Sequence, residues 1–199
     1  MVLLREARTH TDTGLVERCR KGDSSAFDEL VRRYKDRVYC VAYRYLGNRE
    51  DALDVSQEVF VRAYRGIGSF RGTAQVCTWL HSITANLARN RLRDGSRMGR
   101  DKGTSLEAMR ENSPGLADAG DGHASPREAA IAEETQEMLL KCLGELPEQY
   151  RLAFVLRTFD DLSYEEIAEV MECPVGTVKS RLNQARQLLR DQLREHAVI

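Results

Sequence analysis

The chain has 199 residues, which is enough for one or two domains with a modest core in each. Charged residues make up 31% of it and aromatic residues 7%; apolar residues recur at three-to-four spacing and strand-like alternation is hard to find, so we predict an all-α fold. The net charge of -1 argues against a protein that grips DNA unaided, because phosphate neutralisation supplies most non-specific affinity. This balance indicates a DNA-binding subunit that depends on a larger partner, or an autonomous binder with segregated faces.

The five cysteines and four histidines are scattered along the chain. No two cysteines have the Cys-x-x-Cys spacing, which indicates buried thiols in a reducing compartment. No cluster has metal-ligand spacing, so we expect neither a structural zinc nor a cofactor. The opening MVLL is too short for a signal-peptide core and no later run is long enough to span a bilayer, so we expect a cytoplasmic protein.

Residues 12–94 are predicted to form a first domain of four helices, after a loose tail over residues 1–11. Each helix carries apolar residues at helical spacing and is bounded by capping or stop residues. We expect the helices to run from Asp12 to Arg20, from Ser25 to Leu46, from Arg49 to Arg65 and from Gln75 to Arg93.

The third of these helices has an acidic outer face. Its buried stripe is predicted to consist of Ala52, Val55, Val59 and Ala63. The other side then carries Asp51, Asp54, Gln57 and Glu58. Acidic residues in a first turn also stabilise the positive end of the helix dipole, and many such faces are merely solvated. Residue types alone therefore leave open whether this face binds a partner.

The fourth helix follows a glycine-rich loop around Phe70 and carries Trp79 on its apolar side, as a core residue whose indole can reach the surface. The complementary spacing is taken by Ser82, Asn86, Arg89 and Arg93. A polar and basic stripe beside exposed aromatic rings is how proteins hold single-stranded DNA. Taken alone, this helix is only a weak indication.

Residues 95–126 exchange the apolar period for glycine, serine, aspartate and proline, so we predict a flexible linker. As a random coil it would average roughly 30 Å end to end, so the flanking domains can lie far apart. Residues 127–194 are predicted to form a second four-helix domain. Pro126 opens its first helix, Gly144 stops that helix, and Pro147 suits the first turn of the next.

The second domain ends in a helix-turn-helix pattern. Ser163 and Glu166 have the spacing of a reciprocal helix N-cap, and Pro174 separates this helix from the last one. The last helix is predicted to bury Val178, Leu182, Ala185 and Leu189. Such a unit presents its second helix to the DNA major groove. An ordinary helical hairpin is the alternative, but cap, short turn and basic outer face together favour DNA binding.

Two sets of motifs resemble a known family. The first set is REDALDVSQEVFVRAYRGIGSFRG at 49–72 with TWLHSITANLARNRLR at 78–93, and the second is LPEQYRLAFVLRTFDDLSYEEIAEVMECPVGTVKSRLNQAR at 146–186. In this order they resemble bacterial RNA polymerase sigma factors of the extracytoplasmic-function (ECF) type, which belong to the sigma-70 family and keep only its second and fourth domains. The resemblance covers nearly everything except the tail and the linker.

The resemblance implies three binding surfaces. One faces the clamp helices of the polymerase beta-prime subunit through Asp54, Gln57 and Glu58. Another reads the minus-ten promoter element, with a base flipped into a pocket near Asn86, through Phe70, Trp79, Asn86, Arg89 and Arg93. The recognition helix reads the minus-thirty-five element through Val175, Thr177, Lys179, Ser180, Arg181, Asn183 and Gln184. The polymerase beta flap and an anti-sigma factor are further implied partners, and no small-molecule substrate is implied.

Several positions depart from the family pattern. Members often carry an aromatic or basic residue at the position of Asn183 and usually arginine at that of Gln184. Asparagine and glutamine suit bidentate pairing with adenine rather than guanine, so we hypothesise an altered base preference. His81 and Thr84 stand where tyrosine and alanine are common, and the sequence does not say what this changes.

Three functional hypotheses follow. The leading one is a sigma factor that binds core polymerase, recognises both promoter elements and promotes DNA melting without catalysing a reaction. The alternative is an autonomous helix-turn-helix regulator that acts as a dimer, although no sensor domain or dimerisation zipper is recognisable. An enzyme is a weak third hypothesis, because no nucleophile elbow, phosphate-binding glycine loop or metal-ligand cluster occurs.

Overall fold

The computed structural model describes residues 12–70, 72, 74–97 and 126–196. These residues form helices and no strand, which confirms the predicted all-α fold. None of the helices in this part of the chain is long and apolar enough to cross a membrane. The predicted tail over residues 1–11 and most of the predicted linker, residues 98–125, lie outside the described residues, so the linker stays a prediction.

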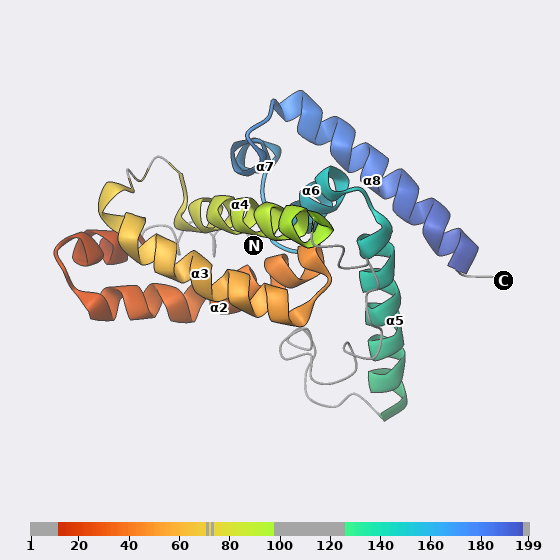
Figure 1. Cartoon of the computed structure of the whole chain (residues 1–199), viewed down its shortest axis with the longest axis horizontal. Coiled ribbons are helices and arrows are strands. Elements are labelled where there is room, and N and C mark those ends of the chain that lie inside the picture. The colour runs from red at the N-terminus through yellow and green to blue at the C-terminus, as the bar shows by residue number, and fades with distance from the viewer. Residues whose placement is uncertain (1–11, 71, 73, 98–125, 197–199) are drawn as a thin grey trace.

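The helices lie where the sequence predicts them (Figure 1). A helical segment over residues 12–20 comes first. The named elements that follow are α2 (Ser24–Leu46), α3 (Arg49–Gly66), the short 3-10 helix η1 (Ile67–Ser69), α4 (Val76–Arg97), α5 (Pro126–Glu145), α6 (Glu148–Thr158), α7 (Tyr164–Met171) and α8 (Val175–His196). The main difference in bounds is that α4 runs to Arg97 instead of Arg93.

The first unit, residues 12–97, is built from α2, α3 and α4 packed on one another. The Asp23 side chain caps α2 by accepting from the Ser25 and Ala26 amides, and α2 ends at Gly47 with φ 71°, where glycine avoids the strain of other residues. The Asn48 side chain caps α3 in the same way. Asp12, predicted as a cap, is buried and accepts from Tyr34 Oη and from Arg33 Nη1 on α2. These caps fix where each helix begins.

The second unit, residues 126–196, contains the helix-turn-helix. The predicted reciprocal cap is present: Ser163 Oγ accepts from the Glu166 amide at 3.2 Å, and Glu166 Oε2 accepts from the Ser163 amide at 2.8 Å. The chain turns out of α7 at Glu172, whose φ is 51°. The predicted buried stripe of α8 is confirmed, because each of its members is 6% exposed or less: Val178, Leu182, Ala185 and Leu189.

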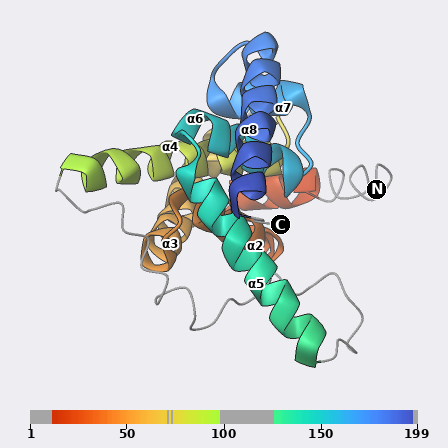
Figure 2. The ribbon, with the colours of Figure 1, turned by 90° about the vertical axis from the view of Figure 1, so that its right-hand side faces the viewer.

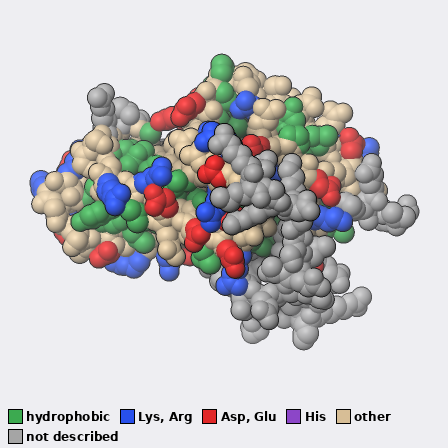
Figure 3. All heavy atoms as spheres, viewed as in Figure 1, with side chains coloured by type: hydrophobic (Ala, Val, Ile, Leu, Met, Phe, Trp, Pro, Cys, Tyr) green, Lys and Arg blue, Asp and Glu red, His purple; other side chains and the backbone are tan. Residues whose placement is uncertain are grey.

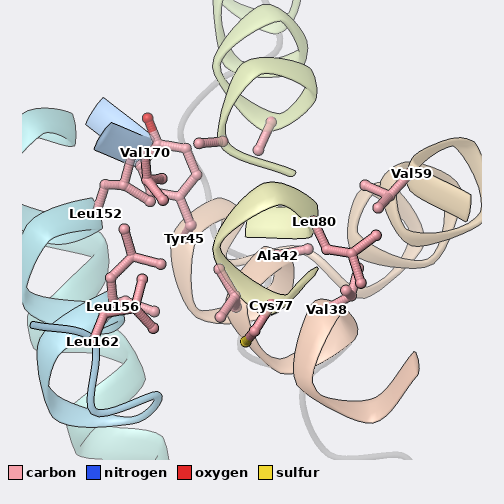
Figure 4. Close-up of a cluster of buried hydrophobic side chains, with 14 of the residues drawn as sticks. Val38, Ala42, Tyr45, Val59, Cys77, Leu80, Leu152, Leu156, Leu162 and Val170 are labelled. Carbon is pink, nitrogen blue, oxygen red and sulfur yellow. The ribbon is translucent and has the colours of Figure 1, made fainter. Parts of the chain in front are cut away.

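The two units are docked against each other, although the linker composition would let them lie far apart. α4 packs against α7, and α2 packs against α5 and α6 (Figures 1 and 2). The buried side chains form one continuous cluster across the two units. Figure 4 shows this cluster passing from Val38 and Leu80 in the first unit, past Tyr45, to Leu152 and Val170 in the second. The described helices therefore share a single core.

Candidate nucleic-acid and protein interfaces

The predicted acidic residues lie on the outer side of α3, opposite its buried stripe. Asp54 and Gln57 are exposed and Glu58 is partly exposed. Arg91 of α4 reaches across to this face: its Nε lies 2.6 Å from Asp51 Oδ1 and its Nη2 lies 2.7 Å from Asp54 Oδ2. Glu58 accepts from Arg62 one helical turn later at 2.8 Å. Exposed pairs of this kind contribute about 0–1 kcal/mol each, so a partner can displace them at small cost.

Exposed apolar residues, which sequence reasoning missed, accompany the acidic ones on α3. Leu53 is 42% exposed, Val61 43% and Tyr64 57%. Leu53 lies four residues before Gln57, Val61 lies four residues after it, and Tyr64 lies three residues after Val61. At this spacing all three share the side of the helix that carries Gln57. Figure 3 shows hydrophobic surface on the α2–α3 side of the molecule, interspersed with charged groups. We call the whole set the α3 outer strip: Leu53, Asp54, Gln57, Glu58, Val61 and Tyr64.

The aromatic pair predicted for minus-ten recognition comes together at the start of α4. The rings of Phe70 and Trp79 lie 4.8 Å apart between centroids. Phe70 is buried and Trp79 is partly exposed, as predicted for an indole that reaches the surface. The Arg20 guanidinium donates to the Phe70 carbonyl and so holds the loop against the first helical segment.

Phe70 and Trp79 border an open groove of about 440 Å³. Most of its lining comes from the end of α3, the following loop and α4, but Glu169 belongs to α7 in the other unit. The complete lining is Arg62, Gly66, Ser69, Phe70, Ala74, Trp79, Ile83 and Glu169. The groove is therefore closed on one side by the helix-turn-helix unit.

The remaining minus-ten candidates lie farther along α4 and do not line this groove. Asn86 follows Trp79 by seven residues, which places it about 10 Å along the helix on the same side as Trp79. The prediction that it lies on the complementary side was wrong in this respect. Asn86 is exposed, and its Oδ1 accepts from Arg89 Nη1 at 3.1 Å. Arg93 is also exposed and donates to Asn90 Oδ1 at 2.9 Å. The structure thus places these polar groups as a strip that continues from the aromatic groove.

The predicted recognition helix, α8, keeps most of its polar candidates exposed and buries its apolar stripe. Four candidates are exposed: Lys179, Ser180, Asn183 and Gln184. The other three are partly exposed: Val175, Thr177 and Arg181. Arg181 donates to Cys173 Sγ in the turn at 3.5 Å, and the Lys179 ammonium lies 6.0 Å from the centre of the Tyr164 ring. The outer side of α8 thus combines short polar groups with cations, as DNA recognition requires.

Comparison with known proteins identifies both units. The chain matches the family "Sigma-70 region 2" over residues 30–98 and the family "Sigma-70, region 4" over residues 136–189. It is 40% identical over 184 residues to the ECF RNA polymerase sigma-E factor of Escherichia coli, which covers 92% of this chain and 94% of that protein. The chain belongs to the ECF family of RNA polymerase sigma factors. This ECF sigma factor is also 39% identical over 180 residues to the RNA polymerase sigma-H factor of Pseudomonas aeruginosa, covering 89% of this chain and 91% of that protein.

Solved structures share the fold of this sigma factor. CnrH in complex with the cytosolic domain of CnrY matches with a TM-score of 0.66 at 24% identity, covering 92% of this chain and 96% of that one. The sigma factor RpoE of Bartonella quintana, in complex with the anti-sigma factor NepR, matches with a TM-score of 0.62 at 23% identity, covering 84% and 96%. At these identities the likeness shows the all-α fold.

Proposed function

We propose that this ECF sigma factor binds core RNA polymerase through the α3 outer strip and reads promoter DNA at two separate elements. The observation that carries the proposal is the presence of two separate surfaces, an aromatic groove in region 2 and the exposed polar side of α8 in region 4. We propose domain limits of 12–94 and 127–194 with a linker over 95–126. The matched regions at 30–98 and 136–189 support the division into two domains, although α4 continues to Arg97, past the first limit. The protein would work in the cytoplasm and catalyse no reaction itself.

The α3 outer strip has the composition of a protein-binding surface. Its apolar residues Leu53, Val61 and Tyr64 would form the centre of the contact, and its acidic residues the rim. The Tyr64 ring packs edge-on against Phe27, with centroids 5.1 Å apart, so it is held in place before binding. A helical partner with basic side chains would replace Arg91 and Arg62 as counterions. The beta-prime clamp helices are the partner that we assign to this strip.

The aromatic groove suits unpaired bases. Stacking of a base on an aromatic side chain contributes about 1–3 kcal/mol, which offsets the cost of flipping a base out of the duplex. Phe70 and Trp79 would support the bases, and Asn86, Arg89 and Arg93 would bind base edges and phosphates along α4. We propose that this strip reads the minus-ten element and holds the melted strand.

We propose that α8 reads the minus-thirty-five element while region 4 binds the beta flap. Val175 and Thr177 open the helix, where major-groove readers make their contacts. Lys179, Ser180 and Arg181 follow, and Asn183 and Gln184 would select adenine through bidentate pairs. The complex of the sigma factor RpoE with the anti-sigma factor NepR supports the proposal that an anti-sigma factor controls this protein.

Transcription in vitro tests the proposal. Purified protein with core enzyme should initiate at defined sites on genomic fragments, and mapping of the starts should give two spaced elements. The alternative, an autonomous dimeric regulator, predicts a footprint on DNA without polymerase and no initiation with core enzyme alone. That second result would overturn the proposal.

The double variant Gln57→Lys/Glu58→Lys is expected to weaken core binding by about 1–3 kcal/mol, because it replaces an acidic and a neutral side chain by positive charges that face a basic partner. Affinity is measured by titration of labelled core enzyme, and circular dichroism should show unchanged helical content. Glu148→Lys/Gln149→Lys is the matched control, with the same residue types exposed at the start of α6. Equal affinities of the two variants would remove this face from the interface.

The Gln184→Arg variant is expected to shift the base preference at one minus-thirty-five position from adenine towards guanine by about 1–3 kcal/mol. Selection of bound promoters from a randomised library with the holoenzyme measures the shift. Gln187→Arg, exposed one turn later on α8, adds the same charge as a control. A wild-type selection that already returns guanine there, unchanged in the Gln184 variant, would refute the hypothesis.

A further inference from the structure

The first helical segment, residues 12–20, contacts the border of the aromatic groove through the side chain at its end. The Arg20 guanidinium donates from Nη2 to the carbonyl of Phe70, which lies 50 residues later in the chain. Phe70 follows η1 in an extended conformation, with φ -63° and ψ 114°, so its carbonyl does not belong to a helix. A charged donor makes a stronger bond to such a carbonyl than a neutral donor does. Arg20 therefore ties the backbone at Phe70 to a distant part of region 2.

The helical segment that carries Arg20 is itself anchored in the first unit. Leu15 and Val16 are buried in the core, at 8% and 4% exposed. At the start of the segment, the buried Asp12 carboxylate accepts from Arg33 Nη1 of α2 at 3.0 Å. Because both ends of this short helix are held, the Arg20 side chain extends from a fixed base and can fix what it binds.

The position of the Phe70 backbone sets the position of the aromatic pair. The Phe70 ring is 9% exposed, and it lies 4.8 Å from the Trp79 ring between centroids with 31° between the ring planes. The neighbouring side-chain bond is local, because Ser69 Oγ donates to the Gly66 carbonyl at 2.9 Å. A local bond keeps the shape of the turn but does not hold the turn against the rest of the unit. The bond from Arg20 does hold it.

We propose that Arg20 is a positioning residue for minus-ten recognition, which holds the Phe70 and Trp79 rings through the Phe70 carbonyl at the spacing that receives unpaired bases. A ring pair that is already in place loses less conformational freedom when a base stacks on it, so the hold on the backbone is gained as affinity and selectivity for DNA. Arg20 acts here through Phe70 and not through its own charge. The effect on DNA rests on the proposed function of the groove, whereas the effect on the rings does not.

The hold on the rings is tested in the free, full-length protein. Trp79 is the sole tryptophan of the chain, so tryptophan fluorescence reports the ring pair. Arg20→Ala should shift the emission to longer wavelength and raise the constant for quenching by acrylamide, and Arg20→Lys, which keeps a charged donor, should recover part of the difference. Lys21→Ala removes the same charge from the next exposed position and should equal the wild type. Wild-type emission and quenching in Arg20→Ala would overturn the proposal.

The effect on DNA is tested with holoenzyme, assembled from core polymerase and each variant, and a labelled pool of single-stranded oligonucleotides randomised over the minus-ten positions. Arg20→Ala should bind the sequence that the wild type selects about five- to tenfold more weakly, with flatter base preferences. The slope of affinity against salt should stay unchanged, because no phosphate contact is lost. A uniform loss over all sequences, with the salt slope reduced by about one, would mean that Arg20 binds phosphate directly and would refute the positioning role.

Two outcomes separate this inference from the proposed function. If the wild type selects a sequence and Arg20→Ala selects it with equal affinity, the positioning role fails and the proposed function stands. If the wild-type holoenzyme selects no sequence from the pool, the proposed function of the groove fails, and the fluorescence of Arg20→Ala alone decides whether Arg20 holds the rings.

Discussion

The Tyr45→Ala variant is expected to lose about 3–5 kcal/mol of unfolding free energy, the usual cost of removing a buried aromatic ring. Tyr45 is 2% exposed near the end of α2. Its side chain points towards Leu152 and Val170 of region 4 (Figure 4). Arg151 Nη1 of α6 donates to the Tyr45 carbonyl at 2.7 Å, so the same residue joins the two regions through backbone and ring. A cavity here would open between the regions as well as within one of them.

Urea unfolding followed by circular dichroism measures this loss. Tyr45→Phe keeps the ring and removes only the hydroxyl, so it should cost about 1 kcal/mol. Because the ring lies where the two regions share a core, we also expect the alanine variant to unfold in two steps, with region 2 and region 4 separating first. A single transition with equal midpoints for the alanine and phenylalanine variants would contradict both expectations.

Local features of the fold could be predicted from the sequence because the signals that set them are local. The cap of α7 needs only Ser163 and Glu166, three residues apart, and both hydrogen bonds are present. The buried stripe of α8 follows from helical spacing alone. Docking of the regions could not be predicted in this way, because Arg37 and Asp160 are 123 residues apart and charged residues usually indicate surface.

The candidate surfaces were predictable in part. Helical spacing placed the acidic residues of α3 on its outer side, and the resemblance gave them a role. Leu53, Val61 and Tyr64 were missed, although they fall outside the predicted buried stripe at helical spacing. Large apolar residues off the buried stripe are the signal that would have found them. His81 was noted only as a departure from the family pattern. Its role depends on the approach of Asp160 from another region, which spacing within α4 cannot show.

His81 is also expected to make the docked structure sensitive to pH. The His81 side chain faces Asp160, which lies in the turn after α6, and Cys77, which lies on α4 like His81 itself. Arg37 and Tyr34 of α2 lie next to these groups. Burial disfavours the charged imidazolium, but Cys77 and Asp160 outweigh this effect and raise the pKa of His81 from 6.5 to about 9. Burial likewise opposes ionisation of Asp160, but His81 and Arg37 outweigh it and lower the pKa of the Asp160 carboxyl.

Raising the pH from 6.5 to above 9 is therefore expected to remove about 3 kcal/mol of unfolding free energy, at about 1.4 kcal/mol for each unit of the His81 pKa shift. The contribution of a raised pKa is fully present below pH 6.5 and lost as the pH rises through about 9. The contribution of the lowered Asp160 pKa to the unfolding free energy is lost only in acid, as the pH falls below the ordinary pKa of 3.8. Stability from these two groups should thus be greatest between these limits.

Unfolding in urea at pH 6, 7.5 and 9.5, on the wild type and on His81→Gln, isolates this effect, because the other titrating groups are common to both proteins. The wild type should lose more stability than the variant across this range, and its radius of gyration before unfolding should rise at the alkaline end. Desolvation opposes the charge on His81, and Cys77 and Asp160 together raise its pKa. Because Asp160 comes from region 4, its share of the pH dependence reports the docked state. Parallel pH profiles for the two proteins would mean that His81 stays neutral, and the docked form would then be held by its apolar contacts and by Arg37 alone.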